Sequence, residues 1–228
     1  MDVFELNKPY ELNDNNGIRM GNINYKIIKG INPFILSAPH AVRQFREDRI
    51  KAHDILTGGI VEYASRFANV NGIIRTFNMY DDPNYDDKGY GLAYKNAMSS
   101  FIRNNGILYL FDVHGCKDYH NFDICIGTNN GANIGHSIIE LEIIKEIFSR
   151  IGKVSIDSKF KAANKNSVSN YVHTHTSIPC FQFEISKEIR INETKKLLEA
   201  LKEIIYEIIK QQKLENYIKE KALVIKNN

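Results

Sequence analysis

The residues best suited to chemistry in this sequence are two histidines and a glutamate, each at the end of an apolar run. The runs are Phe34-Ile-Leu-Ser-Ala-Pro-His40, Leu108-Tyr-Leu-Phe-Asp-Val-His114 and Cys180-Phe-Gln-Phe-Glu184. Imidazole nitrogen is a favoured zinc ligand, and a catalytic zinc usually takes three protein ligands plus water. The pattern therefore predicts a Zn²⁺ ion held between His40 and His114, with a carboxylate as the third ligand.

The third ligand is predicted from proximity in the chain. The nearest carboxylates after His40 are Glu47 and Asp48, in the segment Arg43-Gln-Phe-Arg-Glu-Asp-Arg49. The spacing is too wide for a site on one helix, so a turn must bring the side chains together. Glu47 is the first choice for this ligand, and Asp48 and Asp54 are the alternatives.

Each of these residues has a plainer interpretation. A single histidine at a strand end is more often structural than a metal ligand. Asp112 either orients a ligand histidine or forms a turn. Gln182 and Glu184 alternate with two phenylalanines, a pattern equally typical of the solvated side of a half-buried strand.

The elements that must position these side chains are short apolar runs alternating with helical patterns. The predicted strands are 25–29, 33–37, 72–77, 107–113, 122–126, 153–156 and 180–185. The predicted helices are 49–68, 94–103, 137–151 and a long C-terminal helix beginning near Asn192. This alternation predicts an α/β fold with a mostly parallel or mixed central sheet and helices on both faces. Ligands in such folds collect at the carboxyl ends of strands, where the polar residues lie.

Length and composition predict a single domain over residues 1–228. The formal net charge is +3, and the C-terminal lysines alternate with glutamates, so nucleic-acid binding is not expected. The odd number of cysteines, three, with no CxxC spacing, indicates a reducing compartment. No apolar run approaches the ~20 residues of a membrane span, and a cytoplasmic location is expected. The sequence does not predict an oligomeric state.

Two further segments admit more than one interpretation. Tyr171-Val-His173-Thr-His175 is either a strand carrying a second pair of metal ligands or a solvent-facing loop. The acidic segment from Asp81 to Asp87 is rich in oxygen ligands but lacks the spacing of an EF-hand. A mobile acidic lid is the interpretation we prefer for that segment.

The ordered set Ser37-Ala-Pro-His40, Asp112-Val-His114-Gly115 and Gln182-Phe-Glu184-Ile185 resembles the N-formylglutamate amidohydrolase family. Members of that family are zinc hydrolases whose fold is similar to the zinc carboxypeptidases. The resemblance covers residues from about 33 to about 190. It implies a three-layer sandwich in which His40 and His114 bind zinc and Glu184 is the general base.

The same resemblance extends to substrate binding. Asp82-Pro83-Asn84, which follows Arg75, is similar to a family segment that supplies an arginine and an asparagine near the substrate. Arg75 and Arg46 are the candidates to hold a substrate carboxylate or oxyanion, because a guanidinium matches carboxylate geometry. Either arginine could equally form a surface salt bridge.

The sequence departs from the carboxypeptidase-like pattern at one point, because Arg43 occupies the position of the carboxylate in an HxxE motif. The predicted function is a zinc-dependent amidohydrolase that cleaves a small N-acyl amino acid or a peptide-like substrate. The alternative is a metal-free, non-catalytic ligand-binding protein on the same scaffold. The particular substrate is not predicted.

Overall fold

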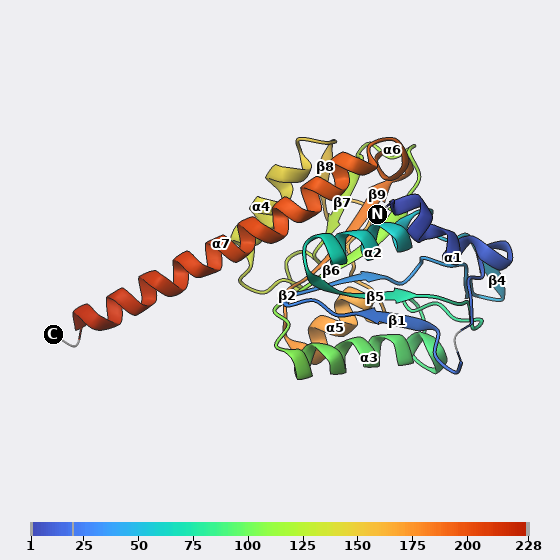
Figure 1. Cartoon of the computed structure of the whole chain (residues 1–228), viewed down its shortest axis with the longest axis horizontal. Coiled ribbons are helices and arrows are strands. Elements are labelled where there is room, and N and C mark those ends of the chain that lie inside the picture. Colours follow the sequence, from blue (N-terminus) through green and yellow to red (C-terminus); the bar gives the residue numbers. More distant parts are fainter. Residues whose placement is uncertain (1, 20, 227–228) are drawn as a thin grey trace.

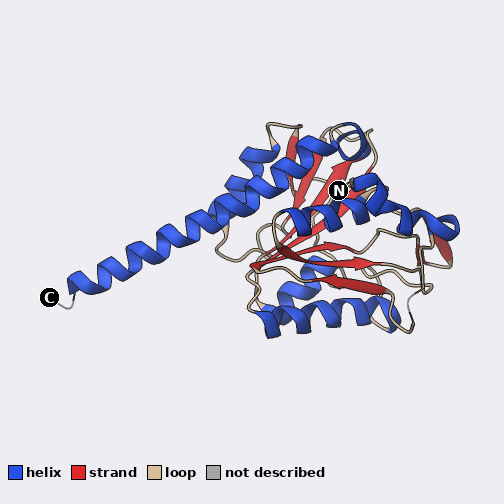
Figure 2. Ribbon diagram, viewed as in Figure 1, coloured by secondary structure: helices blue, strands red, loops and turns tan. Residues whose placement is uncertain are grey.

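The computed structural model describes residues 2–19 and 21–226, with side chains described up to residue 214. A seven-stranded sheet forms the centre of the chain (Figures 1 and 2). Its strands are β1 (Tyr25–Ile28), β2 (Asn32–Ala38), β5 (Val70–Arg75), β6 (Tyr109–Cys116), β7 (Ile124–Gly127), β8 (Val154–Ile156) and β9 (Cys180–Ser186). A separate hairpin consists of β3 (Gln44–Arg46) and β4 (Arg49–Lys51).

The helices cover both faces of this sheet. They are α1 (Val3–Asn15), α2 (Thr57–Phe67), α3 (Gly89–Asn105), α4 (Ile138–Phe148), α5 (Val168–Thr176), α6 (Lys187–Asn192) and α7 (Thr194–Lys226). Helices α3 and α5 lie on one side, and α1, α2, α4 and α7 lie on the other (Figure 1). Helix α7 extends away from the rest of the chain (Figure 1). Within the described residues, no helix combines the length and apolar character needed to cross a bilayer.

The strand order β1-β5-β2-β6-β9-β7-β8 places three parallel strands, β2, β6 and β9, side by side in the middle. Strand β1 is antiparallel to β5, and β7 is antiparallel to β9, so the sheet is mixed. The three-layer α/β fold and the long C-terminal helix predicted from the sequence are confirmed. Each of the seven predicted strands overlaps a strand of the central sheet.

The core has two parts because successive strand residues point to opposite faces. Phe34 and Leu36 of β2 and Phe111 of β6 pack beneath α2, α4 and α7. Ile35 and Leu110 pack on the other face, against α3 and α5. Since β6 is covered on both faces, it is nearly continuous in apolar residues, as buried parallel strands are.

Two predicted elements differ from the structure. The predicted helix over 49–68 begins with strand β4, and helix α2 starts only at Thr57. The segment Tyr171–His175 is neither strand nor loop but part of helix α5, capped at its start by the Ser167 side chain. His173 and His175 turn their Nδ1 atoms to the backbone oxygens of Ile178 and Tyr171, at 2.8 and 2.7 Å. They form no second metal pair.

Candidate metal centre

The two histidines at the strand ends face each other. His40 lies two residues beyond β2, and His114 lies near the end of the adjacent parallel strand β6. Their Nδ1 atoms are 3.2 Å apart. The Oδ2 atom of Asp54 lies 3.3 Å from Nδ1 of His40 and 3.5 Å from Nδ1 of His114. His40, Asp54 and His114 are referred to below as the triad.

The triad has the dimensions of a zinc site. Zinc bonds to nitrogen and carboxylate oxygen are about 2.0–2.2 Å long, and in a tetrahedral site neighbouring ligand atoms are then about 3.3–3.5 Å apart. The three observed separations, 3.2, 3.3 and 3.5 Å, agree with that value. Two imidazoles and one carboxylate are also a known catalytic ligand set, which leaves a fourth position open.

Carboxylates hold the other nitrogen of each imidazole. Nε2 of His40 lies 3.0 Å from Oδ1 of Asp82, and Nε2 of His114 lies 3.1 Å from Oδ2 of Asp112. Asp112 is fully buried, and its Oδ2 also accepts a hydrogen bond from Ser169. A buried carboxylate favours a proton on the facing Nε2, so that Nδ1 keeps its lone pair for a metal. The interpretation of Asp112 as an orienting residue therefore agrees with the geometry.

Backbone contacts fix Asp54 in the triad. Its amide donates to the carbonyl of His40 at 2.8 Å, and its Oδ2 accepts from the amide of Gly115 at 3.0 Å. The Arg190 guanidinium packs against Gly115, so a side chain at this position would have to displace it. A Cβ atom there would lie 2.5 Å from Cζ of Arg190. Arg190 in turn donates to the carbonyls of Ile185 and Ile55, which ties β9 to the segment after Asp54.

Glu184 lies beside the triad rather than in it. It is the register partner of His114 on β9, so both side chains point to the same face of the sheet. Every residue of β9 is buried, and Glu184 is only 8% exposed. The interpretation of Gln182 and Glu184 as a solvated strand face is therefore wrong. Nε2 of Gln182 donates to Oε1 of Glu184 at 3.1 Å, which leaves the rest of the carboxylate facing a cleft.

Burial raises the pKa of Glu184 to about 7, and the negative charges of Asp54 and Asp112 raise it further. His114 and His40 have the opposite effect on this pKa, but they do not outweigh burial. Burial alone would lower the pKa of His40, but Asp82 and Asp54 outweigh it and raise that pKa to about 9. The pKa of His114 is likewise raised, because Asp112 and Asp54 overcome its burial. So many carboxylates around two imidazoles make the centre a strongly cation-attracting site.

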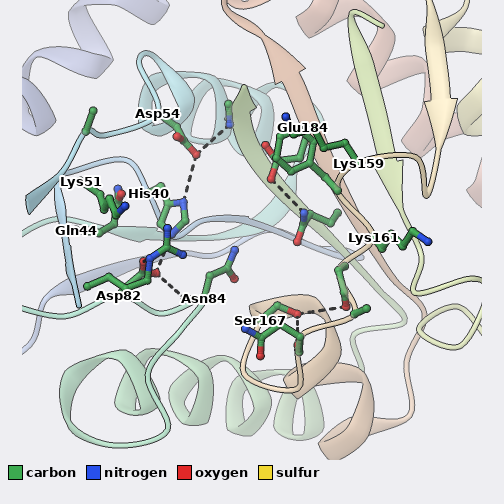
Figure 3. A pocket seen from close by; sticks show the side chains of 18 of the residues that line it. His40, Gln44, Lys51, Asp54, Asp82, Asn84, Lys159, Lys161, Ser167 and Glu184 are labelled. Atoms are coloured by element: carbon green, nitrogen blue, oxygen red, sulfur yellow. Dashed lines mark hydrogen bonds and ion pairs between the residues drawn. The ribbon is translucent and has the colours of Figure 1, made fainter. Parts of the chain in front are cut away.

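The triad opens on a cleft of about 770 Å³. His40, Asp54 and Glu184 line it together with Asp82 and Asn84 (Figure 3). Gln182 is a further lining residue. Loop residues 159–164 form the opposite wall. A titratable glutamate next to a metal-sized triad in a cleft is the arrangement expected of an active site.

The structure does not place Glu47, the first choice for third ligand, with the histidines. Glu47 lies in the exposed turn between β3 and β4, where its carboxylate accepts a hydrogen bond from Tyr85. Asp48 is exposed in the same turn. The hairpin therefore holds the Glu47 and Asp48 carboxylates away from the histidines. After β4 the chain turns back, and Asp54 lies beside His40 and His114.

The predicted substrate-binding residues separate into two groups. Arg46 and Asn84 line the cleft. The Arg46 Nε atom lies 3.8 Å from Asp82, and Asn84 Oδ1 accepts from the Val168 amide at 2.7 Å. Arg75 is fully buried at the end of β5, does not line the cleft, and pairs with Asp81. The prediction that Arg75 binds substrate is therefore not supported.

The start of the acidic segment is packed, which does not agree with a mobile lid there. Asp81 and Asp82 are 2% and 1% exposed, and Arg75 donates to both the carboxylate and the carbonyl of Asp81. This arrangement delivers Asp82 to His40, a role the sequence reasoning missed. The only signal for it was the charged Arg75 at the end of an apolar strand, because a buried arginine requires an acidic partner.

Comparison with solved structures identifies the fold. N-formylglutamate amidohydrolase from Ralstonia eutropha JMP134 has a TM-score of 0.65 at 11% identity, covering 82% of this chain and 98% of that one. A bacteriophage poly-γ-glutamate hydrolase has a TM-score of 0.56 at 17% identity, covering 85% and 93%. A Burkholderia mallei protein named as a carboxypeptidase has a TM-score of 0.51 at 10% identity, covering 82% and 60%.

No protein-family model and no curated protein matches the sequence. At such low identities the structural likeness establishes the fold. The resemblance to the N-formylglutamate amidohydrolase family, inferred from three short segments, is confirmed at that level.

Proposed function

We propose that the protein is a zinc-dependent hydrolase of amide bonds, with His40, Asp54 and His114 as the metal ligands. The observation that carries this proposal is the triad itself, whose three donor atoms are 3.2–3.5 Å apart, with a carboxylate behind each imidazole. Asp54 takes the place of Glu47 in the ligand set. When bound, zinc supplies a Lewis acid that polarises a carbonyl and lowers the pKa of water.

Glu184 is the general base of this proposal. Its buried carboxyl has a pKa raised to about 7, close to the pH at which a base both holds and releases a proton readily. A cation in the triad would lower that pKa, which keeps the carboxylate ionised at neutral pH. Glu184 takes a proton from the attacking water and passes it to the departing amine.

The proposed substrates are small N-acyl amino acids or peptide-like amides. Arg46, which lines the cleft, is the candidate to hold a substrate carboxylate, and Asn84 lines the same cleft. The names of two structural neighbours, N-formylglutamate amidohydrolase and poly-γ-glutamate hydrolase, both describe hydrolysis of glutamate amides, which supports this choice.

The metal-free binding protein depends on the absence of a carboxylate in an HxxE motif after His40, and Asp54 supplies a carboxylate beside the two histidines from further along the chain. Cys116, two residues after His114, is also a poor candidate for a catalytic nucleophile. Burial raises the pKa of Cys116 to about 12, so this thiol remains protonated and is a poor nucleophile at neutral pH.

The test is hydrolysis of a panel of N-acyl glutamates and short peptides by protein purified without chelator. We expect about one zinc per chain, loss of hydrolysis on chelation, and recovery on adding zinc. Hydrolysis that survives chelation but is lost on thiol alkylation would overturn the proposal.

The unpaired, buried cysteines agree with the proposed cytoplasmic location, because a reducing compartment leaves thiols free.

A further inference from the structure

A second cleft opens beside the triad, and the proposed function does not yet use it. Its volume is about 760 Å³, close to that of the cleft described above, which is called the first cleft from here on. The two clefts share the wall residues Ala52, Asp54, Gly115, Lys117 and Phe160. Because Asp54 belongs to the triad, a group bound in the second cleft lies directly beside the proposed metal centre.

The second cleft meets the triad on the side away from Arg46. Asp54 faces Nδ1 of His40 and Asp82 faces Nε2, so the two carboxylates lie on opposite sides of this imidazole (Figure 3). Arg46 is on the Asp82 side, with its Nε atom 3.8 Å from that carboxylate. Only Asp54 of these two carboxylates lines the second cleft. A substrate that reaches from Arg46 across the triad therefore has its other end at the second cleft.

The proposed reaction decides which end of the substrate that is. Glu184 and Arg46 line the first cleft, and the described lining of the second cleft contains neither. In the proposed function, Glu184 passes a proton to the departing amine, and Arg46 holds the carboxylate of the amino acid. The amine side of the amide bond thus belongs in the first cleft. The acyl side is left for the second.

Aromatic rings form much of the second cleft. Its lining includes Tyr119, His120 and Phe160, and the His120 ring centroid lies 4.5 Å from that of Tyr119 and 5.4 Å from that of Phe160. Behind them, the buried Phe122 stacks on His120 at 5.1 Å with an interplanar angle of 11°. The rings pack on one another, so this surface is formed before any ligand binds. Ile55 adds aliphatic surface.

The charged residues of the second cleft do not change the character of its inner lining. Lys117, Asp118 and Lys187 are exposed, so they lie where the lining meets solvent. Arg190 is 3% exposed, and its guanidinium donates to the backbone carbonyls of Ile185, Ile55 and Cys116. Its hydrogen bonds serve the fold. The inner lining therefore offers chiefly aromatic and aliphatic surface, as small-molecule sites commonly do.

We propose that the second cleft is an acyl subsite for an aromatic ring, and that the preferred substrates are amino acids N-acylated by an arylalkanoic acid, such as N-phenylacetyl amino acids. This inference rests on the proposed function and names the acyl side of its substrate. In the reaction, the oxygen of water bonds to the acyl carbon and the C–N bond breaks. The nitrogen takes up a proton, and an aromatic carboxylic acid and a free amino acid are released.

The lining favours a ring over other acyl groups. A formyl or acetyl group is too small to reach into a cleft of this volume. An aliphatic chain would reach, but aromatic pairs gain stability beyond the area that they bury. The ammonium groups of Lys117 and Lys159 each lie 5.7 Å from the Tyr119 ring centroid. Cations at this position attract the face of an aromatic ring, which an aliphatic chain does not provide.

The test uses full-length, zinc-loaded protein and matched sets of N-phenylacetyl, N-hexanoyl and N-acetyl derivatives of glutamate, alanine and phenylalanine. Within a set the amine side is constant, so the ratio of kcat/KM values reports on the acyl group alone. We expect the phenylacetyl compound to exceed the acetyl compound roughly tenfold or more, as expected for burial of a ring. It should exceed the hexanoyl compound about two- to tenfold. Equal values, or a preference for hexanoyl, would overturn the inference.

Two variants each remove one ring from the second cleft. Tyr119 is 71% exposed, so Tyr119→Ala should fold like the parent, and Phe160→Leu keeps an apolar side chain against the buried Phe122 and Cys125. Each variant should lower the phenylacetyl-to-acetyl ratio of kcat/KM about two- to tenfold. A merely structural defect would reduce both values together and leave this ratio unchanged, which would count against the inference.

The matched control is Tyr206→Ala. Tyr206 is also an exposed ring next to a lysine ammonium, that of Lys202 at 5.6 Å, but it lies on α7 and lines neither cleft. This variant should keep the phenylacetyl-to-acetyl ratio of the parent. A change in the control as large as that in Tyr119→Ala would show that the second cleft does not set the preference.

Binding of the released acid separates this inference from the proposed function, because phenylacetate cannot be hydrolysed. Saturation-transfer NMR with zinc-loaded protein should show phenylacetate binding more tightly than acetate or hexanoate, and Tyr119→Ala should weaken it about two- to tenfold. If N-acetyl amino acids are hydrolysed with zinc but neither preference is seen, only this inference fails. If chelation and Glu184→Gln leave hydrolysis unchanged, the proposed function fails, and ring-dependent binding of phenylacetate still identifies an aromatic site.

Discussion

His114 and Glu184 are register partners on adjacent parallel strands, so their Cα atoms face each other across one ladder of the sheet. This pairing places the His114 imidazole, a proposed metal ligand, and the buried Glu184 carboxylate on the same face at the carboxyl end of the sheet. The relationship is set by the backbone of two central strands, not by a loop. The spacing between Glu184 and His114 is therefore fixed by the pairing of two buried strands.

Glu184→Gln should retain zinc and fold but lose about 10²–10⁴-fold in turnover. Glutamine keeps the shape and the contact with Gln182 but cannot accept a proton, and general acid–base assistance has that typical magnitude. The measurement is kcat on an N-acylglutamate, together with zinc content and thermal unfolding. Turnover close to that of the parent would remove Glu184 from the reaction, and loss of zinc would make it a ligand.

The sheet could be predicted from the sequence because its strands are short apolar runs with clear ends. The same feature makes His40, His114 and Glu184 recognisable in the sequence, because each is a polar residue at the end of an apolar run. The third ligand could not be found in this way. Closeness in sequence favours Glu47, but the hairpin of β3 and β4 projects it outward, and the long-range contact with Gly115 places Asp54 beside the two histidines instead.

Other features of the site depend on tertiary contacts that sequence patterns do not contain. Acidic composition suggested an exposed lid from Asp81 to Asp87, but the ion pair with Arg75 buries Asp81 and Asp82. The lysines of the cleft come from separate parts of the chain, at positions 51, 117, 159 and 161. Their common location follows from the fold, and a search for a charge run along the sequence would miss it.

Asp54→Asn should release zinc, whereas Glu47→Gln should not. Asparagine removes the negative charge from the triad, and losing a direct ligand should cost more than the roughly 10–100-fold typical for an outer partner. Glu47 contacts only the exposed Tyr85 hydroxyl in its turn. Zinc affinity can be measured by competition with a chromophoric chelator. Loss of zinc in Glu47→Gln alone would make Glu47 the third ligand, and full retention by both variants would exclude both carboxylates.

Asp112→Asn should weaken zinc binding about 10–100-fold without direct contact to the metal. The carboxylate accepts the Nε2 proton of His114, whereas an amide NH₂ facing that nitrogen favours the proton on Nδ1, where the metal must bind. Compared with the parent, Asp112→Asn should bind zinc more weakly, whereas the two chelator-treated proteins should unfold at the same temperature.

Ser169→Ala is the control for Asp112, because it removes the second hydrogen bond to Oδ2 and leaves the carboxylate in place. It should bind zinc nearly as tightly as the parent. Equal losses of affinity in both variants would indicate a general packing defect instead of tautomer control.

Because of Lys95, the free energy of unfolding should increase as the pH becomes alkaline. Its ammonium is buried and donates to the carbonyls of Asp86 and Asn166, at 2.7 and 2.6 Å, which joins the loop carrying Asn84 to the loop before α5. Burial lowers the pKa of Lys95 from 10.5 to about 8, although the surrounding aspartates oppose the shift. Between these two pH values the unfolded chain holds more protons than the folded one, so stability rises with pH.

The expected gain from Lys95 is about 2–3 kcal/mol between pH 8 and pH 10.5. Urea unfolding of the parent and of Lys95→Met across this range isolates it, because the variant does not titrate at this position. The buried tyrosines Tyr10 and Tyr94, whose pKa values are raised, are present in both proteins and cancel in the difference. The parent should gain on the variant as pH rises. A difference that is flat with pH would show that Lys95 has an ordinary pKa, and a difference that shrinks would reverse the sign of its burial effect.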